Sequence, residues 1–423
     1  MLVVSAIQEN KEKVIEGLKK RNFKQLELVD EVLNMDELRR KTQFELDNLL
    51  AESNKLSKEI GQLFQQGKAD EANVLKEKTA EQKTQIKEAQ DLLVKYEESL
   101  KSMLYQIPNV PSEKVVAGVT AEDNEIVFTN GDASPKTDAI PHWELAKKFN
   151  LIDFELGVKI TGAGFPVYIG KGARLQRALI QYFLDKNTEA GYTEIIPPFM
   201  VNEASGYGTG QLPDKEGQMY FVNEDNLYLI PTSEVPVTNI YRDELLNESQ
   251  LPIQLTAYSP CFRREAGSYG KDVRGLNRLH QFEKVEIVRI EKPENSYAAL
   301  ETMVDHVKGL LEDLELPYRI LRLCGGDTGF ASAMTYDFEV FSAAQEKWLE
   351  VSSVSNFETF QANRLKLRFK NNEGKNEFCH TLNGSALALP RIMACILENH
   401  QQADGSIKIP EKIRNYTGFD LIN

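Results

Sequence analysis

Residues 261–287 read CFRREAGSYGKDVRGLNRLHQFEKVEI, and this stretch decides the fold of the second part of the chain. Both ends alternate hydrophobic and polar residues around a glycine-rich, basic middle, which predicts two strands joined by a long loop. Arg263 and Glu265 lie two residues apart, so on a strand their side chains share one face. A guanidinium beside a carboxylate suits a nucleotide, because the first binds phosphate and the second accepts from an exocyclic amine. An ordinary hairpin with a solvated basic loop explains these two residues equally well.

The letter-by-letter sequence of this region carries a more specific signal. Phe262 to Gly267, the loop Ser268 to Gly275 and the return strand His280 to Glu286 resemble motif 2 of the class II aminoacyl-tRNA synthetases, and within that class the seryl-tRNA synthetases. The resemblance extends over essentially the whole chain. It implies ATP-dependent activation of L-serine to seryl-adenylate and transfer to the 3′ end of tRNA(Ser), with tRNA(Sec) left open as a second substrate.

Composition sets broad limits. A chain of 423 residues, 41% hydrophobic and 27% charged, is long enough for two or three globular domains. The formal net charge of -14 argues against a general nucleic-acid coat protein, although a basic patch on an acidic protein can still bind RNA. The sequence starts without a signal-peptide pattern and no window approaches the roughly 18 apolar residues of a membrane span, so we expect a cytoplasmic protein without a membrane partner.

Simple metal and nucleotide motifs do not fit the sequence. The four cysteines stand far apart without a C-x-x-C pair, so neither a disulfide framework nor a zinc site is expected. Residues 164–171, GFPVYIGK, have one residue too many between the glycines and are followed by Gly172, so they fail as a Walker A loop. Val167 stands where a dinucleotide fingerprint needs its third glycine. A bound nucleotide must be held in another way.

Residues 1 to about 110 form a separate block that is rich in Glu, Lys, Gln and Leu. A 4-3 spacing runs from Leu28 to Leu63 and again from Leu75 to Ile107, with a turn signal at residues 65–70. Two such helices joined by a short turn fold back as an antiparallel coiled coil, here roughly 50 Å long. The block carries 18 basic and 20 acidic residues, so only about -2 of the net charge of -14 lies in it.

Most coiled coils are scaffolds or dimerisation devices, and exposed lysines usually form only a solvated face. The family resemblance instead implies an N-terminal arm that grips the long variable arm of the tRNA through its shape and backbone. The candidates for phosphate contacts are Arg39, Arg40, Lys41, Lys55, Lys58, Lys76 and Lys83.

Two prolines, Pro108 and Pro111, end the helical block, because proline cannot continue a helix. We therefore expect a tRNA-binding arm over residues 1–110, a linker at about residues 107–140 and a catalytic domain over residues 111–423. Beyond the linker the chain mixes helices with short strands, which predicts an α+β fold. By its resemblance, the catalytic domain is built on an antiparallel β-sheet flanked by helices.

A helix followed by a strand comes before motif 2. Leu175, Leu179, Tyr182 and Phe183 mark one buried helix face, and Gly191 to Pro198 turns into a strand. As a bare pattern this is common to many proteins. It resembles motif 1, which builds the dimer interface of class II enzymes, so the resemblance implies a homodimer.

Three further segments take roles from the resemblance. Thr232-Ser233-Glu234 alone reads as a helix cap, but in the family such a loop binds the substrate serine. Residues Glu350-Val351-Ser352-Ser353 match the segment for ATP and Mg²⁺, with Glu350 and Ser353 as metal ligands. His380 to Arg391 resembles motif 3, whose arginine lies against adenine and meets the terminal phosphates.

The implied site needs no side-chain general base, because the serine carboxylate is already an anion at pH 7 and has only to be held in line with the α-phosphorus of ATP. Arg263 and Arg391 are the catalytic pair, Phe282 stacks on adenine opposite Arg391, and Glu265 accepts from the exocyclic amine. The ATP contacts are Arg263, Arg264, Glu265, Phe282, Glu350, Val351, Ser352, Ser353 and Arg391. The serine contacts are Thr232, Ser233, Glu234, Arg263, Glu286, Asn383 and Ser385.

Three alternatives stay open at this point. A threonyl- or prolyl-tRNA synthetase is disfavoured by the N-terminal hairpin and by the set Thr232, Glu234, Glu286 and Ser385. A paralogue that activates an amino acid for a carrier protein would be expected to lack the tRNA arm. A non-enzymatic coiled-coil binding protein would leave the arginines and carboxylates of the three motifs without a reason.

Overall fold

The computed structural model describes residues 1–136, 138–214, 217–265 and 274–423. Residues 266–273 of the predicted motif 2 lie outside these ranges. They comprise the last two residues of its first segment, 266–267, and residues 268–273 of its loop. The chain divides into two compact units. One comprises Leu2–Glu16 and Phe23–Pro108, and the other comprises Met1, Gly17–Asn22 and Asn109–Asn423.

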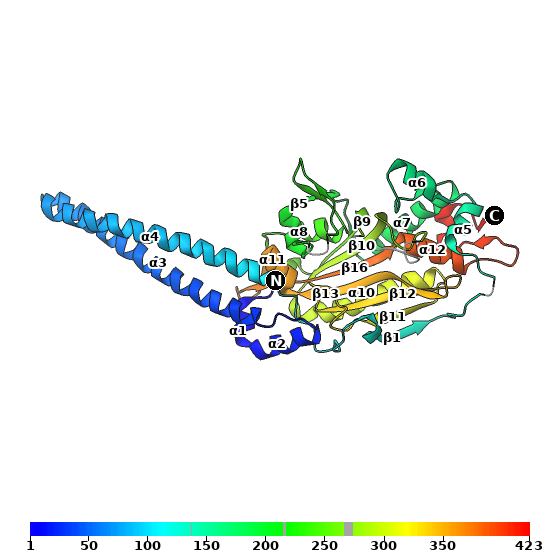
Figure 1. Ribbon diagram of the computed structural model, residues 1–423, viewed down its shortest axis with the longest axis horizontal. Coiled ribbons are helices and arrows are strands. Elements are labelled where there is room, and N and C mark those ends of the chain that lie inside the picture. The colour runs from blue at the N-terminus through cyan, green and yellow to red at the C-terminus, as the bar shows by residue number, and fades with distance from the viewer. Residues whose placement is uncertain (137, 215–216, 266–273) are drawn as a thin grey trace. The chain divides into compact units, whose positions relative to one another are not determined.

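The first unit contains a long helical hairpin. Helices α3 (Leu28–Gln65) and α4 (Ala69–Leu104) lie side by side (Figure 1), and the 38 residues of α3 make it about 57 Å long. Two shorter helices, α1 (Val4–Glu9) and α2 (Lys11–Lys20), precede them in the sequence. The hairpin confirms the predicted coiled coil, although α4 begins at Ala69 rather than Leu75 and ends before Ile107.

The second unit is organised around an eight-stranded sheet in the order β1-β11-β12-β13-β16-β10-β9-β4. Neighbouring strands are antiparallel except β4 and β9, which are parallel. Strands β9 and β10 correspond to the two predicted strands of motif 2, and they pair from Phe262 opposite Gln281 onward. The first strand ends at Phe262, so Arg263 and Glu265 follow the strand, and the expectation that they share one face of it was wrong. The eight strands are β1 (Glu125–Asn130), β4 (Thr193–Glu194), β9 (Ile253–Phe262), β10 (Gln281–Glu291), β11 (Tyr318–Arg322), β12 (Met334–Ser342), β13 (Lys347–Glu358) and β16 (His380–Ala388).

Three helices pack with one face of this sheet to form the main hydrophobic core: α7 (Lys171–Glu189), α10 (Ser296–Asp313) and α12 (Leu389–Asn399). The predicted buried face of α7 is confirmed, because its four hydrophobic residues belong to that core. Val285 and Ile287 of β10 lie in the same core. Because side chains alternate along a strand, Glu286 between them faces the opposite side of the sheet.

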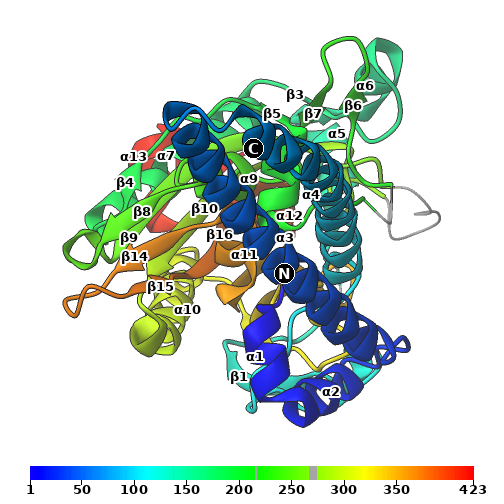
Figure 2. The ribbon, with the colours of Figure 1, turned by 90° about the vertical axis from the view of Figure 1, so that its left-hand side faces the viewer.

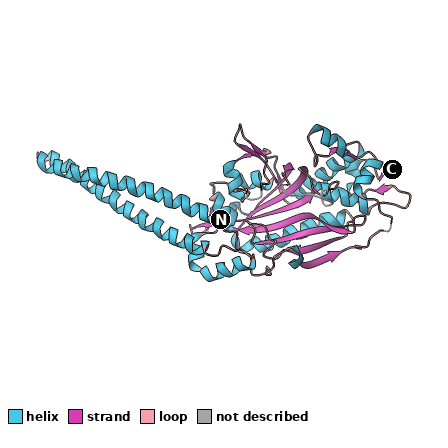
Figure 3. Ribbon diagram, viewed as in Figure 1, coloured by secondary structure: helices cyan, strands magenta, loops and turns pink. Residues whose placement is uncertain are grey.

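Shorter elements complete the second unit and confirm the α+β fold, whose strands are magenta and helices cyan in Figure 3. The helices are α5 (His142–Lys148), α6 (Phe154–Ile160), α8 (Glu203–Thr209), α9 (Glu234–Asn239), α11 (Thr359–Leu365) and α13 (Arg414–Thr417). The strands are β2 (Ile152–Asp153), β3 (Val167–Tyr168), β5 (Met200–Asn202), β6 (Phe221–Val222), β7 (Leu227–Leu229), β8 (Leu245–Asn247), β14 (Arg368–Lys370), β15 (Asn376–Phe378), β17 (Ile407–Lys408) and β18 (Leu421–Ile422). None of the helices in the described ranges has a stretch long and apolar enough to cross a lipid bilayer.

Candidate functional site

Polar side chains from distant parts of the sequence meet on the central strands β9, β10 and β16, which lie side by side in Figures 1 and 2. Glu286 of β10 pairs in register with Ser385 of β16. Asn383 stands two residues before Ser385, so it shares the same face. The sheet register therefore brings the predicted serine contacts of motifs 2 and 3 together.

Glu286 is fully buried and lies at the centre of this group. Its Oε1 accepts a hydrogen bond from Thr232 Oγ1 over 2.8 Å, and its Oε2 accepts one from Asn383 Nδ2 over 2.7 Å. Lys284 forms an ion pair with Oε1. Sequence reasoning did not single out Lys284, although it alternates with Phe282 and Glu286 along one strand and therefore shares their face. These partners compensate for the cost of burying a carboxylate.

Glu234, the first residue of α9, is a second buried carboxylate. It accepts a hydrogen bond from Gln361 Nε2 over 2.7 Å. The pKa of Glu234 is raised to about 7: burial is the main cause and the charge of Glu286 adds to it, while the hydrogen bond from Gln361 and the charges of Lys284 and Arg263 lower it. The carboxyl group therefore changes its charge near neutral pH, and an incoming ammonium group would favour its anionic form.

The predicted nucleotide contacts of motif 2 also lie together. The Arg263 guanidinium lies over the Phe282 ring, 5.3 Å from its centroid, and its Nε donates to the Pro231 carbonyl oxygen over 3.4 Å. Glu265 adopts a φ of 48°, a left-handed conformation that is costly for a residue other than glycine and is often found at functional sites. Its carboxylate pairs with Arg278 at 2.8 Å.

The arginine of motif 3 connects two other segments. Arg391, in the first turn of α12, donates from Nε to the Asn277 carbonyl oxygen over 3.1 Å and from a terminal nitrogen to the Glu350 carbonyl oxygen over 2.6 Å. The Glu350 carboxylate lies 3.8 Å from the same guanidinium. One side chain therefore holds the return of motif 2 against the strand that carries Glu350.

An irregularity in the sheet brings Glu350 and Ser353 to one face. On β12, Asp337 pairs with Ser353 and Glu339 pairs with Glu350, so β13 contains one extra residue in this interval, at Val351. Such a β-bulge restores a common face to residues three apart, which would otherwise point to opposite sides. The sequence alone did not reveal the bulge.

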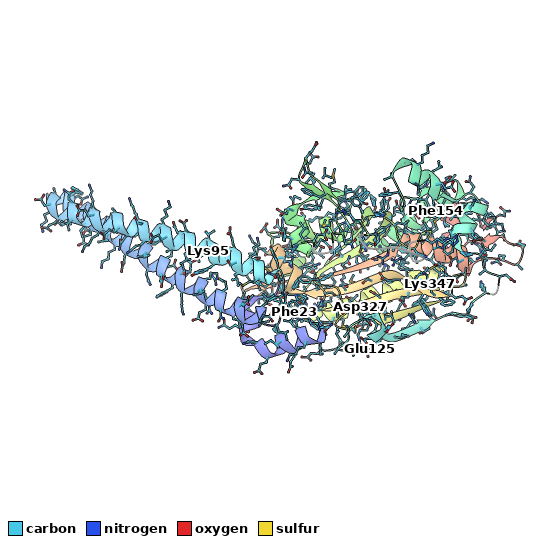
Figure 4. All side chains as sticks on the ribbon, viewed as in Figure 1. Phe23, Lys95, Glu125, Phe154, Asp327 and Lys347 are labelled. Atoms are coloured by element: carbon cyan, nitrogen blue, oxygen red, sulfur yellow. The ribbon has the colours of Figure 1, made fainter. Side chains whose placement is uncertain are left out.

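A cavity of about 860 Å³ opens on this face. Its lining includes Glu234, Asp337, Glu350 and Ser353, and it extends to Asp327, which Figure 4 labels. Arg263, Phe282 and Arg391 are not part of that lining. Arg391 is nevertheless joined to it through its hydrogen bond to Glu350.

Asp337 is the least satisfied carboxyl group in this lining. Its Oδ1 is buried without a hydrogen-bond partner among the described residues. Burial raises the pKa of Asp337 well above its usual range, and the charge of Glu350 adds to the rise while a hydrogen bond with Ser353 opposes it. A hard cation would provide a partner for the oxygen atoms of Asp337, Glu350 and Ser353. Within the described residues no group of three or more His, Cys, Asp or Glu side chains could hold a metal alone, so substrate phosphates or water would complete the shell.

Three predicted contact residues turn their side chains away from the cavity. Val351 packs in the hydrophobic core, Ser352 donates its hydroxyl to the Ser385 carbonyl oxygen over 2.6 Å, and the buried Ser233 faces the backbone of β9. Arg264 is exposed. Val351, Ser352 and Ser233 could therefore contact a ligand in the cavity only through their backbone atoms.

The basic candidates of the hairpin fall into two groups. Arg39, Arg40 and Lys41 form ion pairs with acidic residues of the same helix, and Lys76 lies over an aromatic ring. The others are exposed and make no ion pair with any residue in the described part of the chain: Lys55, Lys58 and Lys83.

Family models match both units. Residues 1–111 match the seryl-tRNA synthetase N-terminal domain, and residues 220–400 match the tRNA synthetase class II core domain (G, H, P, S and T). A serine–tRNA ligase of Salinibacter ruber is 50% identical over 424 residues, which cover 100% of this chain and 99% of the relative.

Solved structures are similar over the same extent. The seryl-tRNA synthetase of Pyrococcus horikoshii, crystallised with ATP, is 34% identical with a TM-score of 0.92, covering 100% of this chain and 99% of that chain. The cytoplasmic serine–tRNA ligase of Naegleria fowleri, in complex with AMP, is 28% identical with a TM-score of 0.88 and the same coverage.

Proposed function

We infer that this chain, which belongs to the seryl-tRNA synthetase family, is a serine–tRNA ligase that activates L-serine with ATP and transfers it to tRNA(Ser). One observation carries the proposal. Glu286 and its partner Asn383 lie on the adjacent strands β10 and β16, Arg263 directly follows the neighbouring strand β9, and Arg391 at the start of α12 is hydrogen-bonded to Glu350 in the cavity wall.

The serine pocket is proposed to form around two carboxylates with different tasks. Glu234 binds the α-ammonium group, and Glu286 accepts a hydrogen bond from the serine hydroxyl with help from Ser385 on the same face. A carboxylate has about four acceptor positions, so Glu286 retains capacity beside Thr232, Asn383 and Lys284. Alanine would leave these buried groups unpaired, and for that reason the site rejects it.

The two arginines are proposed to orient and neutralise ATP. Arg391 uses two of its five donors on backbone carbonyl oxygens, and the others stay available for phosphate. Arg263 and Phe282 already lie in contact, so adenine and the α-phosphate would meet them as one surface. Holding the serine carboxylate in line with the α-phosphorus then gives seryl-adenylate and pyrophosphate without a general base.

Mg²⁺ is proposed to bind at Glu350, Ser353 and Asp337, because this wall offers oxygen ligands and one buried carboxylate oxygen without a partner. When bound, the ion neutralises charge on the ATP phosphates and the departing pyrophosphate. The bulge at Val351 gives these three side chains their common face.

The proposal also covers the tRNA, the second subunit and the cellular location. The hairpin of α3 and α4 would bind the tRNA backbone, with residues 1–110 as the arm and residues 111–423 as the catalytic domain. A homodimer would form through α7 and β4. The apolar Ile196, two residues after β4, is 83% exposed. The cytoplasm is the proposed location, and tRNA(Sec) is a possible further substrate only where that tRNA exists.

Exchange of pyrophosphate into ATP, measured with serine, threonine, proline and alanine in turn, tests this function. We expect exchange with serine alone. Exchange with threonine or proline instead, or no exchange with any of the four, would refute the proposal.

A further inference from the structure

His142, the first residue of α5, is fully buried beside the return of motif 2. Its Nε2 accepts a hydrogen bond from the Leu276 backbone N–H over 2.8 Å, and its Nδ1 lies 2.6 Å from Glu398 Oε1. Because Nε2 accepts from a peptide N–H, the ring proton belongs on Nδ1 and points at Glu398. Both ring nitrogens of His142 are therefore occupied in one defined tautomer.

Arg274 and Gly275, which precede Leu276, also contact the first turn of α5. The Arg274 guanidinium lies over the ring of Trp143, 4.7 Å from its centroid. Gly275 has a φ of +67°, and a Cβ atom there would lie 2.2 Å from His142 Nε2, so only glycine fits against the imidazole. The first turn of α5 thus holds three consecutive residues, Arg274 to Leu276.

The next two residues reach the nucleotide site. The Asn277 carbonyl oxygen accepts from Arg391 Nε over 3.1 Å, and Arg278 pairs with Glu265 at 2.8 Å. A shift of residues 276–278 along the chain would therefore move the partners of Arg391 and Glu265 together.

A second connection runs through Gln345 to the helix of motif 3. Gln345 accepts from Asn277 Nδ2 over 2.8 Å and donates to Glu398 Oε1 over 3.0 Å. Glu398 and Arg391 both lie on α12, seven residues apart, so they share one face of that helix. The helix that carries the motif 3 arginine also carries the carboxylate that holds His142.

We propose that His142, oriented by Glu398, is a positioning residue for ATP: it fixes the register of residues 274–278, and through them the orientation of Arg391 and Glu265. The inference rests on the proposed function. His142 itself lies outside the cavity lining, so it acts only through these neighbours.

Two substitutions separate this role from simple core packing. The terminal amide of His142→Gln can place an oxygen acceptor near the former Nε2, whereas that of His142→Asn reaches only as far as Nδ1. We expect His142→Asn to raise the KM for ATP about tenfold, with the KM for serine changed less than about threefold, because one buried hydrogen bond to the Leu276 N–H is lost. We expect His142→Gln to restore the KM for ATP to within about threefold of the unmodified protein.

His306 provides the matched control. It is a half-buried histidine whose Nε2 lies 2.7 Å from Asn187 Oδ1, and it makes no contact with residues 274–278 in the described part of the chain. His306→Asn should leave both KM values unchanged even if it lowers the thermal midpoint. Equal KM values for ATP in the two His142 variants, or parallel rises in the KM for ATP and for serine, would overturn the proposal.

A surface variant keeps the test decisive if the buried variants fail to fold. Arg274→Ala removes the contact with Trp143 from an exposed side chain and should raise the KM for ATP about threefold. Its control is Arg368→Ala, which removes an equivalent contact of 4.7 Å with Phe378 elsewhere. An Arg274→Ala variant indistinguishable from Arg368→Ala would overturn the positioning role. Serine-dependent exchange by the unmodified protein is measured first, so failure of the proposed function is recognised separately.

Discussion

Arg391 donates a hydrogen bond to the backbone carbonyl oxygen of Glu350 over 2.6 Å, while the Glu350 carboxylate stays 3.8 Å away. The arginine of motif 3 is thus anchored mainly to the backbone of the neighbouring segment. The carboxylate of Glu350, half exposed in the cavity wall, retains its oxygens for a cation. Under the proposed function, Arg391 and Glu350 would therefore serve the same nucleotide, the first as a phosphate partner and the second as a cation ligand.

The first prediction concerns pH. Because the pKa of Glu234 is raised to about 7, the carboxyl group is anionic above neutral pH and protonated below it. Only the anion pairs with the serine ammonium group, so serine affinity should rise with pH through about 7 and be about tenfold lower at pH 6 than on the plateau. Isothermal titration of serine between pH 5.5 and 8.5 measures this. Glu234→Gln should bind weakly at every pH, and a flat profile for the unmodified protein would contradict the assignment.

The second prediction concerns Lys284. Lys284→Met leaves the buried Glu286 carboxylate without its cation, and breaking a buried pair from one side is costly. We expect kcat/KM for serine in pyrophosphate exchange to fall at least a hundredfold, with the KM for ATP changed less than about threefold. Lys292→Met is the control, because Lys292 pairs with Glu248 at 3.1 Å in a far more exposed position, where ion pairs contribute little. Similar losses in both variants would argue against a role in the serine pocket.

The third prediction concerns Asp337. Asp337→Asn removes the negative charge that Asp337 would carry with a cation bound, so the Mg²⁺ concentration for half-maximal exchange should rise about tenfold, and the affinity for Mn²⁺ measured by electron paramagnetic resonance should fall in parallel. Asp327→Asn is the control. Asp327 also lines the cavity but accepts a hydrogen bond from Asn124 over 2.7 Å in an exposed position. An identical metal dependence of both variants would remove Asp337 from the site.

The fourth prediction concerns the hairpin. Replacing Lys55, Lys58 and Lys83 together by glutamine should leave serine-dependent exchange unchanged but raise the KM for tRNA about tenfold, and it should lower the salt dependence of tRNA binding by roughly two to three ions released. The control replaces three lysines of the other unit whose side chains reach solvent: Lys366, Lys375 and Lys408. An equal rise in the KM for tRNA in both triple variants, or no rise in either, would show that the hairpin lysines make no specific contribution.

Periodicity sufficed to predict the hairpin and the paired strands of motif 2, because heptad spacing and strand alternation are local properties of the sequence. Lys284 could have been found in the same way, since it alternates with Phe282 and Glu286. The meeting of Glu286 with Asn383 and Ser385 was named only through a family resemblance, because strand register across a hundred residues is not a local property.

Other features depend on tertiary structure alone. The bulge at Val351, which aligns Glu350 and Ser353 opposite Asp337, is a register shift between two strands and leaves no local pattern. His142 and Glu398 are 256 residues apart, and neither stands in a recognisable motif. The spacing of a single strand or helix could not have indicated either relationship.

The central claim is that serine recognition and ATP binding belong to one site on the sheet. Isothermal titration with a nonhydrolysable seryl-sulfamoyl adenosine, compared with its alanyl counterpart, tests it most directly, because each molecule must occupy both halves at once. We predict that the seryl compound binds about a hundredfold or more tightly than the alanyl compound, and that Glu286→Gln abolishes most of this difference. Equal affinities for the two compounds, or a difference that Glu286→Gln leaves intact, would contradict the account.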